Sequence, residues 1–107
     1  MKMSEVLKRD NLLVEFLREH KGGRSCVSSA EIAKYLNDKG YATKKQTVPS
    51  IIRKLMYERT LPICHKNSTG YFWAETREEI QASINDLEGR ISEMQSHIEH
   101  LKSFIIF

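Results

Sequence analysis

The chain has 107 residues, of which 40% are hydrophobic and 29% charged, and its net charge is +3, a balance typical of one small folded domain with a short addition rather than of a disordered protein. No apolar run reaches the roughly 18 residues that a membrane-spanning helix needs, and residues 1–10 lack the apolar core of a signal peptide, so we expect a cytoplasmic protein. Cys26 and Cys64 fit no metal-binding or redox spacing and are expected to stay reduced thiols.

The first element is a helix predicted over residues 4–20, because apolar residues recur there at helical spacing with polar residues between them. Gly22 and Gly23 follow, and glycine readily adopts the left-handed conformation in which helices end. Residues 24–27 then form either a short edge strand or a connecting loop. The apolar face of this first helix consists of Val6, Leu7, Leu13, Val14 and Leu17.

A second helix is predicted to begin at a capping box formed by Ser28 and Glu31, in which each side chain accepts a hydrogen bond from the other residue's backbone N–H. Gly40 supplies its end. The apolar face between these two points consists of Ile32, Ala33 and Leu36.

A third helix is predicted after a short turn, where Thr43 and Gln46 form a second candidate capping box. Pro49 has no backbone N–H and fits only the first turn of a helix. The regular helix is therefore expected to begin near Gln46 or Thr47, with residues 43–45 in a looser lead-in. Its buried stripe is expected to consist of Val48, Ile51, Ile52 and Leu55.

Residues 61–66 and 70–74 are predicted to form two strands, joined by a polar turn at residues 67–70 that is rich in residue types tolerant of tight bends. Tyr71, Phe72 and Trp73 favour the extended conformation. These aromatic side chains suit either base stacking or packing. Packing is the better interpretation, because helices this short leave little else to close the core.

Residues 76–107 are predicted to form a separate dimerisation unit, a long helix that begins at a third capping box, Thr76 with Glu79. Its apolar residues alternate in spacings of four and three, the pattern of a left-handed coiled coil. The helix would be roughly 40 Å long and cannot cover this seam within its own chain, so we expect a homodimer. The apolar ladder consists of Ile80, Ile84, Leu87, Ile91, Met94, Ile98, Leu101 and Ile105.

The two partner helices run either parallel or antiparallel. Isoleucine alternating with leucine or methionine favours parallel helices, whereas an antiparallel pair brings Glu88 towards Lys102. The apolar tail at residues 104–107 is expected to pack into the dimer or onto a neighbouring domain.

The N-terminal domain and the dimerisation unit also differ in net charge: residues 1–74 hold 14 Lys and Arg against 7 Asp and Glu, and residues 75–107 hold 3 against 7. The first unit is therefore the one expected to meet an anion.

Two short helices followed by a hairpin resemble the winged helix-turn-helix DNA-binding proteins of bacteria and their phages. The resemblance covers residues 11–74 and is carried by SSAEIAKYL in the second helix, TVPSIIRKL in the third, and LPI and GYFWA in the hairpin. It implies a mainly α fold with a small β-hairpin wing, residues 1–75 as one domain, and a transcriptional regulator that binds double-stranded DNA. Pro49 and the length of the turn before the third helix depart from the commonest family pattern.

Most of the candidate DNA-binding residues lie in the reading helix with its lead-in, around residues 44–58, and in the wing at residues 61–74. If the apolar stripe of the helix faces the core, the opposite side displays cationic and amide groups suited to phosphates and base edges. Residues near the helix start approach bases most closely, so Lys45, Gln46 and Ser50 are the base-reading candidates. The candidates on this helix and its lead-in are Lys44, Lys45, Gln46, Ser50, Arg53 and Lys54; further phosphate contacts are expected from Ser28 and Ser29 at the start of the second helix and from Lys66 and Asn67 in the hairpin.

Catalysis, a cofactor and a metal site are not expected. The sequence contains no nucleophile–base arrangement, paired-carboxylate motif or glycine-rich phosphate loop. Cys64 and His65 are adjacent on a predicted strand and would point to opposite faces, which argues against joint metal ligation. The competing function is that of a winged-helix adaptor, which binds a second protein and oligomerises through its coil without binding DNA.

Overall fold

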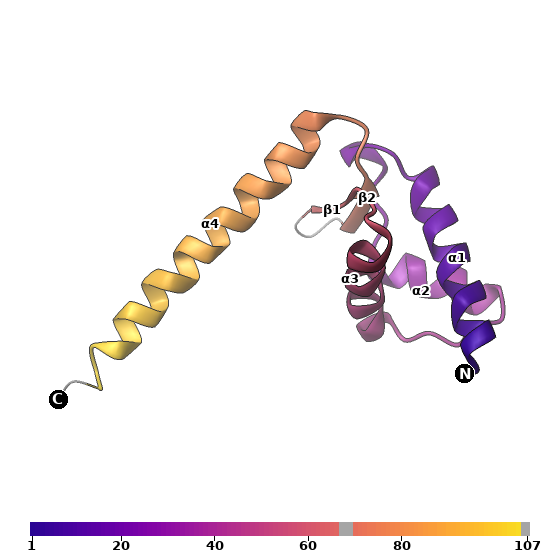
Figure 1. The fold of residues 1–107 in the computed structure, drawn as a ribbon, viewed down its shortest axis with the longest axis horizontal. Helices are drawn as coiled ribbons and strands as arrows, with labels where there is room; N and C mark the ends of the chain where they lie inside the picture. Colours follow the sequence, from indigo (N-terminus) through magenta and orange to yellow (C-terminus); the bar gives the residue numbers. More distant parts are fainter. Residues whose placement is uncertain (67–69, 106–107) are drawn as a thin grey trace.

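The computed structural model describes residues 1–66 and 70–105, and these residues form a mainly α-helical protein with one antiparallel hairpin, as predicted. In chain order the elements are α1 (Met3–Glu19), the 3₁₀ turn η1 (Gly23–Ser25), α2 (Ser29–Asp38), the 3₁₀ turn η2 (Lys45–Thr47), α3 (Val48–Arg59), β1 (Ile63–Lys66), β2 (Gly70–Trp73) and α4 (Arg77–Lys102). Helices α1, α2 and α3 form a packed body with the hairpin, and α4 projects away from it (Figure 1).

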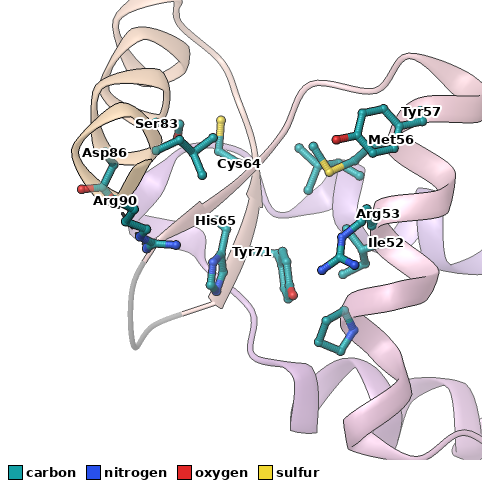
Figure 2. Close-up of a pocket in the computed structure, with 13 residues that line it drawn as sticks. Ile52, Arg53, Met56, Tyr57, Cys64, His65, Tyr71, Ser83, Asp86 and Arg90 are labelled. Carbon is teal, nitrogen blue, oxygen red and sulfur yellow. Dashed lines mark ion pairs between the residues drawn. The ribbon is translucent and has the colours of Figure 1, made fainter. Parts of the chain in front are cut away.

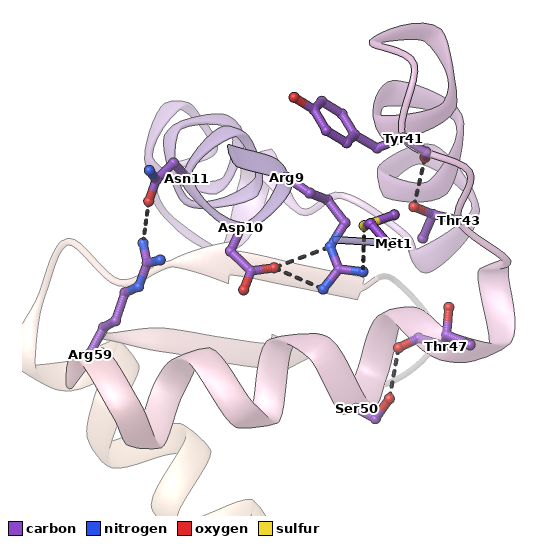
Figure 3. A network of polar contacts seen from close by, with 9 residues as sticks. All are labelled: Met1, Arg9, Asp10, Asn11, Tyr41, Thr43, Thr47, Ser50 and Arg59. Carbon is purple, nitrogen blue, oxygen red and sulfur yellow. Dashed lines mark hydrogen bonds and ion pairs between the residues drawn. The ribbon is translucent and has the colours of Figure 1, made fainter. Parts of the chain in front are cut away.

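The core forms where α1 packs on α2 and β2, and α2 on α3. The predicted first helix agrees with α1 within one residue at each end, but Leu7 from its predicted apolar face is exposed. Asp10 is buried on α1, and its Oδ1 accepts hydrogen bonds from Nε and Nη2 of Arg9 at 3.1 and 3.0 Å (Figure 3). The fully buried side chains include Leu13, Leu17, Val27, Ile32, Leu36, Val48, Ile52 and Leu55.

The segment between α1 and α2 contains η1 and two single bridges to β2. Lys21 lies beside Trp73 and Val27 beside Tyr71. Val27 and Tyr71 exchange backbone hydrogen bonds, both of 2.8 Å. Gly70 lies against Val27 with a φ of +116°, and a Cβ atom there would overlap the Val27 carbonyl, so this position requires glycine. The segment is thus a loop that is pinned to the hairpin at both ends.

The predicted capping box at the start of α2 is confirmed, whereas the one before α3 is not formed. The Glu31 N–H donates to Ser28 Oγ at 3.1 Å, and the Ser28 N–H donates to Glu31 Oε1 at 3.3 Å. The Thr43 hydroxyl donates instead to the Tyr41 carbonyl at 2.8 Å (Figure 3). Because η2 separates Thr43 from α3, this residue is not adjacent to the free N–H groups of the helix.

Helix α3 begins at Val48, slightly later than predicted, because residues 45–47 form η2. The Thr47 hydroxyl donates to the Lys44 carbonyl at 2.7 Å and stabilises this turn. Pro49 occupies the second position of α3. Backbone N–H groups in the first turn of a helix make no intrahelical hydrogen bond, so the absence of an N–H at Pro49 costs the helix nothing.

In the hairpin, Ile63 pairs with Trp73 and His65 with Tyr71. The strands agree with the predicted ones but are shorter at their outer ends. Tyr71 and Phe72 are buried, as the packing interpretation of the aromatic residues expects. The first three residues of the predicted turn lie outside the described residues.

Helix α4 begins at the predicted capping box: the Glu79 N–H donates to Thr76 Oγ1, and the Thr76 N–H donates to Glu79 Oε1, both at 3.2 Å. The Glu79 carboxylate also accepts hydrogen bonds from the backbone N–H groups of Glu75 at 2.8 Å and Gly23 at 2.7 Å. The bond to Gly23 attaches the start of α4 to the body. The helix then contacts β1 before it extends away (Figure 1).

The C-terminal end of α4 differs from the prediction. The helix ends at Lys102, and residues 103–105 form a tighter turn in which the Ile105 N–H donates to the Lys102 carbonyl at 3.0 Å. Ile105 therefore lies after the helix and is not part of its ladder. The seven ladder residues on α4, from Ile80 to Leu101, are each 41% to 64% exposed. Within the described chain, no helix combines the length and the apolar character that crossing a membrane requires.

Candidate nucleic-acid interface

A basic surface lies on the side of α3 that faces away from the core. Val48, Ile52 and Leu55 are buried on the opposite side of the helix. Within the surface, Ser50 Oγ donates to the Thr47 carbonyl at 2.9 Å (Figure 3). The six predicted side chains of this surface are all exposed, namely Lys44, Lys45, Gln46, Ser50, Arg53 and Lys54.

Only half of these six residues lie on the helix. Lys44, Lys45 and Gln46 precede α3 and belong to η2 and its first flanking position, so the predicted reading helix at residues 44–58 is corrected to 48–59 with a 3₁₀ lead-in. The reason is Pro49. A helix that began near residue 44 would need the Pro49 N–H to bond the Lys45 carbonyl, and the ring would clash with that carbonyl. The lysines are therefore presented by a turn.

Two contacts from other helices hold the basic surface in place. Arg59, at the end of α3, donates to Asn11 Oδ1 of α1 at 2.8 Å (Figure 3). Asn37, at the end of α2, makes hydrogen bonds with both backbone groups of Thr43, just before η2. The chain is thus attached to the body on both sides of the basic surface, at Thr43 before it and at Arg59 after it.

The start of α2 is less open to an anion than predicted. Ser28 and Ser29 are half-buried, and the Ser28 hydroxyl both accepts from the Glu31 N–H and contacts Glu31 Oε1, each at 3.1 Å. The Glu31 carboxylate therefore already lies near this helix end, where the helix dipole favours a negative charge. A DNA phosphate at Ser28 would compete with Glu31.

In the hairpin, Lys66 is the exposed last residue of β1, and Asn67 lies outside the described residues.

A groove of about 260 Å³ runs between α3, the hairpin and α4 (Figure 2). Arg53 is the one member of the predicted surface that reaches it. Sequence reasoning did not place any residue of α4 beside the basic surface. The residues that line the groove include Ile52, Arg53, Tyr57, His65, Tyr71 and Arg90.

His65 lines this groove, and two charged residues of α4 affect its pKa. Its ring stacks on Tyr71 with 4.7 Å between the centroids. Partial burial lowers the pKa of His65 from its usual value, the positive charge of Arg90 lowers it further, and the carboxylate of Asp86 opposes both. Arg90 Nη2 lies 3.5 Å from Asp86 Oδ2. The one sequence signal for a role of Arg90 is its positive charge in the middle of a helix in which acidic residues outnumber Lys and Arg.

The described residues do not bring together three His, Cys, Asp or Glu side chains as a metal ion would require. Cys26 and Cys64 are free thiols. Comparisons with protein-family models, with curated proteins and with solved structures found no match to this chain.

Proposed function

We propose that the chain is a dimeric, sequence-specific protein that binds double-stranded DNA, a cytoplasmic transcriptional regulator of the winged helix-turn-helix type. The exposed basic surface at residues 44–54 carries the proposal, because α3 is anchored in the core on one side, and α3 and its 3₁₀ lead-in display these side chains on the other. The DNA major groove admits an α-helix, and arginine, lysine and glutamine are suited to its base edges and to phosphates. The hairpin lies beside α3 and would contact the neighbouring backbone (Figure 1).

The second part of the proposal is a homodimer formed through α4. The seven ladder residues on α4 remain 41% to 64% exposed in one chain, and a continuous apolar stripe of this kind marks an association surface. A second α4 covers the stripe by knobs-into-holes packing, in either orientation. Two linked DNA-binding units then select two spaced half-sites and gain affinity through effective concentration.

The affinity for duplex DNA, measured against salt concentration, tests the proposal. Duplexes selected from a random-sequence pool serve as the probe, and about six phosphate contacts per complex give a log–log slope of roughly −5. Arg53→Ala and Lys45→Ala should each weaken binding about tenfold, since each removes a charged contact. Glu88→Ala, on the far side of α4, should leave it unchanged. Failure to bind any duplex, an affinity independent of salt, or equal losses from all three variants would contradict the proposal.

A protein-binding adaptor is the second candidate, and one observation favours it. Tyr57 lines the groove beside α3 and is 82% exposed, and aromatic residues are enriched at protein interfaces. Recovery of one stoichiometric protein partner without retained DNA would support the adaptor over the regulator.

A further inference from the structure

The groove between α3, the hairpin and α4 gathers three nitrogen-rich side chains from three elements: Arg53 of α3, His65 of β1 and Arg90 of α4. Figure 2 shows the Arg53 guanidinium extending towards Tyr71 from one side, and the Arg90 guanidinium lying beside His65 on the other. The stacked rings of His65 and Tyr71 lie between the two guanidinium groups, so a single anionic group can meet Arg90 and His65 together on the α4 side of the groove, while Arg53 lines its other wall.

We propose that the α4 side of this groove binds a backbone phosphate of duplex DNA, with His65 and Arg90 as its hydrogen-bond donors. The inference rests on the proposed DNA-binding function and extends it, because it adds α4 to the interface. Arg53 follows Ser50 by three residues and lies on the same exposed side of α3. A strand whose bases approach Ser50 can therefore pass a phosphate beside Arg53 and into the groove.

The charges around His65 favour an anion at this position. Burial and the nearby Arg90 lower the pKa of the imidazole, so its cationic form is disfavoured in the protein alone. A phosphate beside Arg90 would offset its positive charge, raise the pKa of His65 and allow the imidazolium to donate a hydrogen bond. The titratable and charged groups that line the hollows beside His65 include Arg90, Asp86 and Glu79 of α4, Arg53 and Tyr57 of α3, Tyr71 of β2 and the adjacent Lys66 of β1.

Asp86 should act against the phosphate. It forms an i, i+4 ion pair with Arg90 at 3.5 Å, and the two side chains are 54% and 40% exposed, so water screens their attraction. A phosphate would compete with Asp86 for Arg90 and would be repelled by its carboxylate. Removal of the Asp86 charge should therefore strengthen DNA binding.

Duplex affinities of full-chain variants test the inference in both directions. Arg90→Gln should weaken binding about tenfold and make the salt slope shallower by about two, because the dimer loses one contact in each half, whereas Arg90→Lys should keep most of the affinity. Arg77→Gln is the matched control, because it removes the same charge from α4 outside the groove. Asp86→Asn should tighten binding about threefold, a gain that misfolding cannot produce, and Glu88→Gln is its control with the same change in charge.

The pKa of His65, followed by NMR of its imidazole, supplies an independent readout and should rise when the duplex is added. Inorganic phosphate is the second probe. If it raises this pKa and the duplex does not, the groove binds a free anion and the inference is wrong. If Arg90→Gln and Asp86→Asn bind like the wild type while Lys45→Ala loses affinity, the inference is wrong and the proposed function stands. If the wild type binds no duplex, both are wrong.

Discussion

Asn37 holds both backbone groups of Thr43. Its Oδ1 accepts a hydrogen bond from the Thr43 N–H at 2.8 Å, and its Nδ2 donates to the Thr43 carbonyl at 2.9 Å. Asn37 lies in the last turn of α2, and Thr43 directly precedes Lys44. One amide side chain therefore fixes the turn that leads into the lysine-rich part of the basic surface.

Asn37→Ala should lower the free energy of unfolding by about 1–2 kcal/mol, because two exposed hydrogen bonds are lost, and should also weaken duplex binding by loosening this turn. Asn37→Asp should be destabilising too, since a carboxylate oxygen would replace the donor that faces the Thr43 carbonyl. Urea unfolding measures both effects. Asn85→Ala is the control: it removes an exposed asparagine that accepts one hydrogen bond, from Gln81 within α4, and should change the free energy little. Equal losses at the two positions would contradict the assigned role.

The sequence predicts those features of the fold that depend on residues close together in the chain, and it misses those that depend on contacts between separate elements. The capping boxes at Ser28 and Thr76 were predictable because both partners lie within one helical turn of each other. The Thr43 box satisfied the same spacing and does not form, because the hydrogen bonds of Thr43 go to Asn37 and Tyr41. A pairing between α2 and the following loop depends on the path of the chain and leaves no mark in a short motif.

The candidate site shows the same division. The exposure of Arg53 and Lys54 followed from the apolar stripe on the other side of α3, which is a local pattern. The approach of Arg90 to His65 did not, because it depends on the direction in which α4 leaves the hairpin. The end of α4 at Lys102 was also missed, since the heptad spacing continues to Ile105 while the helix does not.

Gly89 and Gly40 form a matched pair for a test of backbone strain, because a Cβ atom would meet no atom within 4 Å at either position. Gly89 lies inside α4 with helical neighbours, so Gly89→Ala should raise stability by about 0.5–1 kcal/mol. Gly40 has a φ of +92°, so Gly40→Ala should cost about 1 kcal/mol or more. Opposite shifts in the urea midpoint are expected. Stabilisation by both substitutions would show that the turn after α2 does not require a left-handed residue.

Glu79 should make the stability of the protein depend on pH in the acidic range. Hydrogen bonds from the backbone N–H groups of Glu75 and Gly23 lower the pKa of its carboxyl group from the usual value, with a smaller opposing effect of burial. Because the folded-state pKa lies below that of the unfolded chain, the stabilisation is fully present above the ordinary glutamate pKa. It is lost as the pH falls through the lowered value.

Glu79→Gln should therefore reduce the loss of thermal stability between about pH 6 and about pH 3. It should also lower stability near neutral pH, since a neutral amide accepts hydrogen bonds less strongly than a carboxylate. Glu78→Gln removes the same charge from the same helical turn and leaves the hydrogen bonds of Glu79 in place, so it should retain the wild-type pH profile. If the two variants share one profile, the carboxylate of Glu79 does not attach α4 to the body in the way the structure describes.

Ile91 is the central ladder residue of α4 and one of the two most exposed, at 64%. Ile91→Glu places a charge in the seam of the proposed dimer, where it would be buried without a partner, so the measured mass should fall from that of a dimer to that of a monomer. Ser92→Glu adds the same side chain one residue further along α4, outside the ladder, and should remain dimeric. Analytical ultracentrifugation over a range of concentrations separates these results.

Loss of the dimer should also weaken duplex binding by more than the added charge alone, because each domain would then bind one half-site without its linked partner. A wild-type protein that stays monomeric, or an Ile91→Glu variant that stays dimeric, would mean that the ladder meets something other than a second copy of α4.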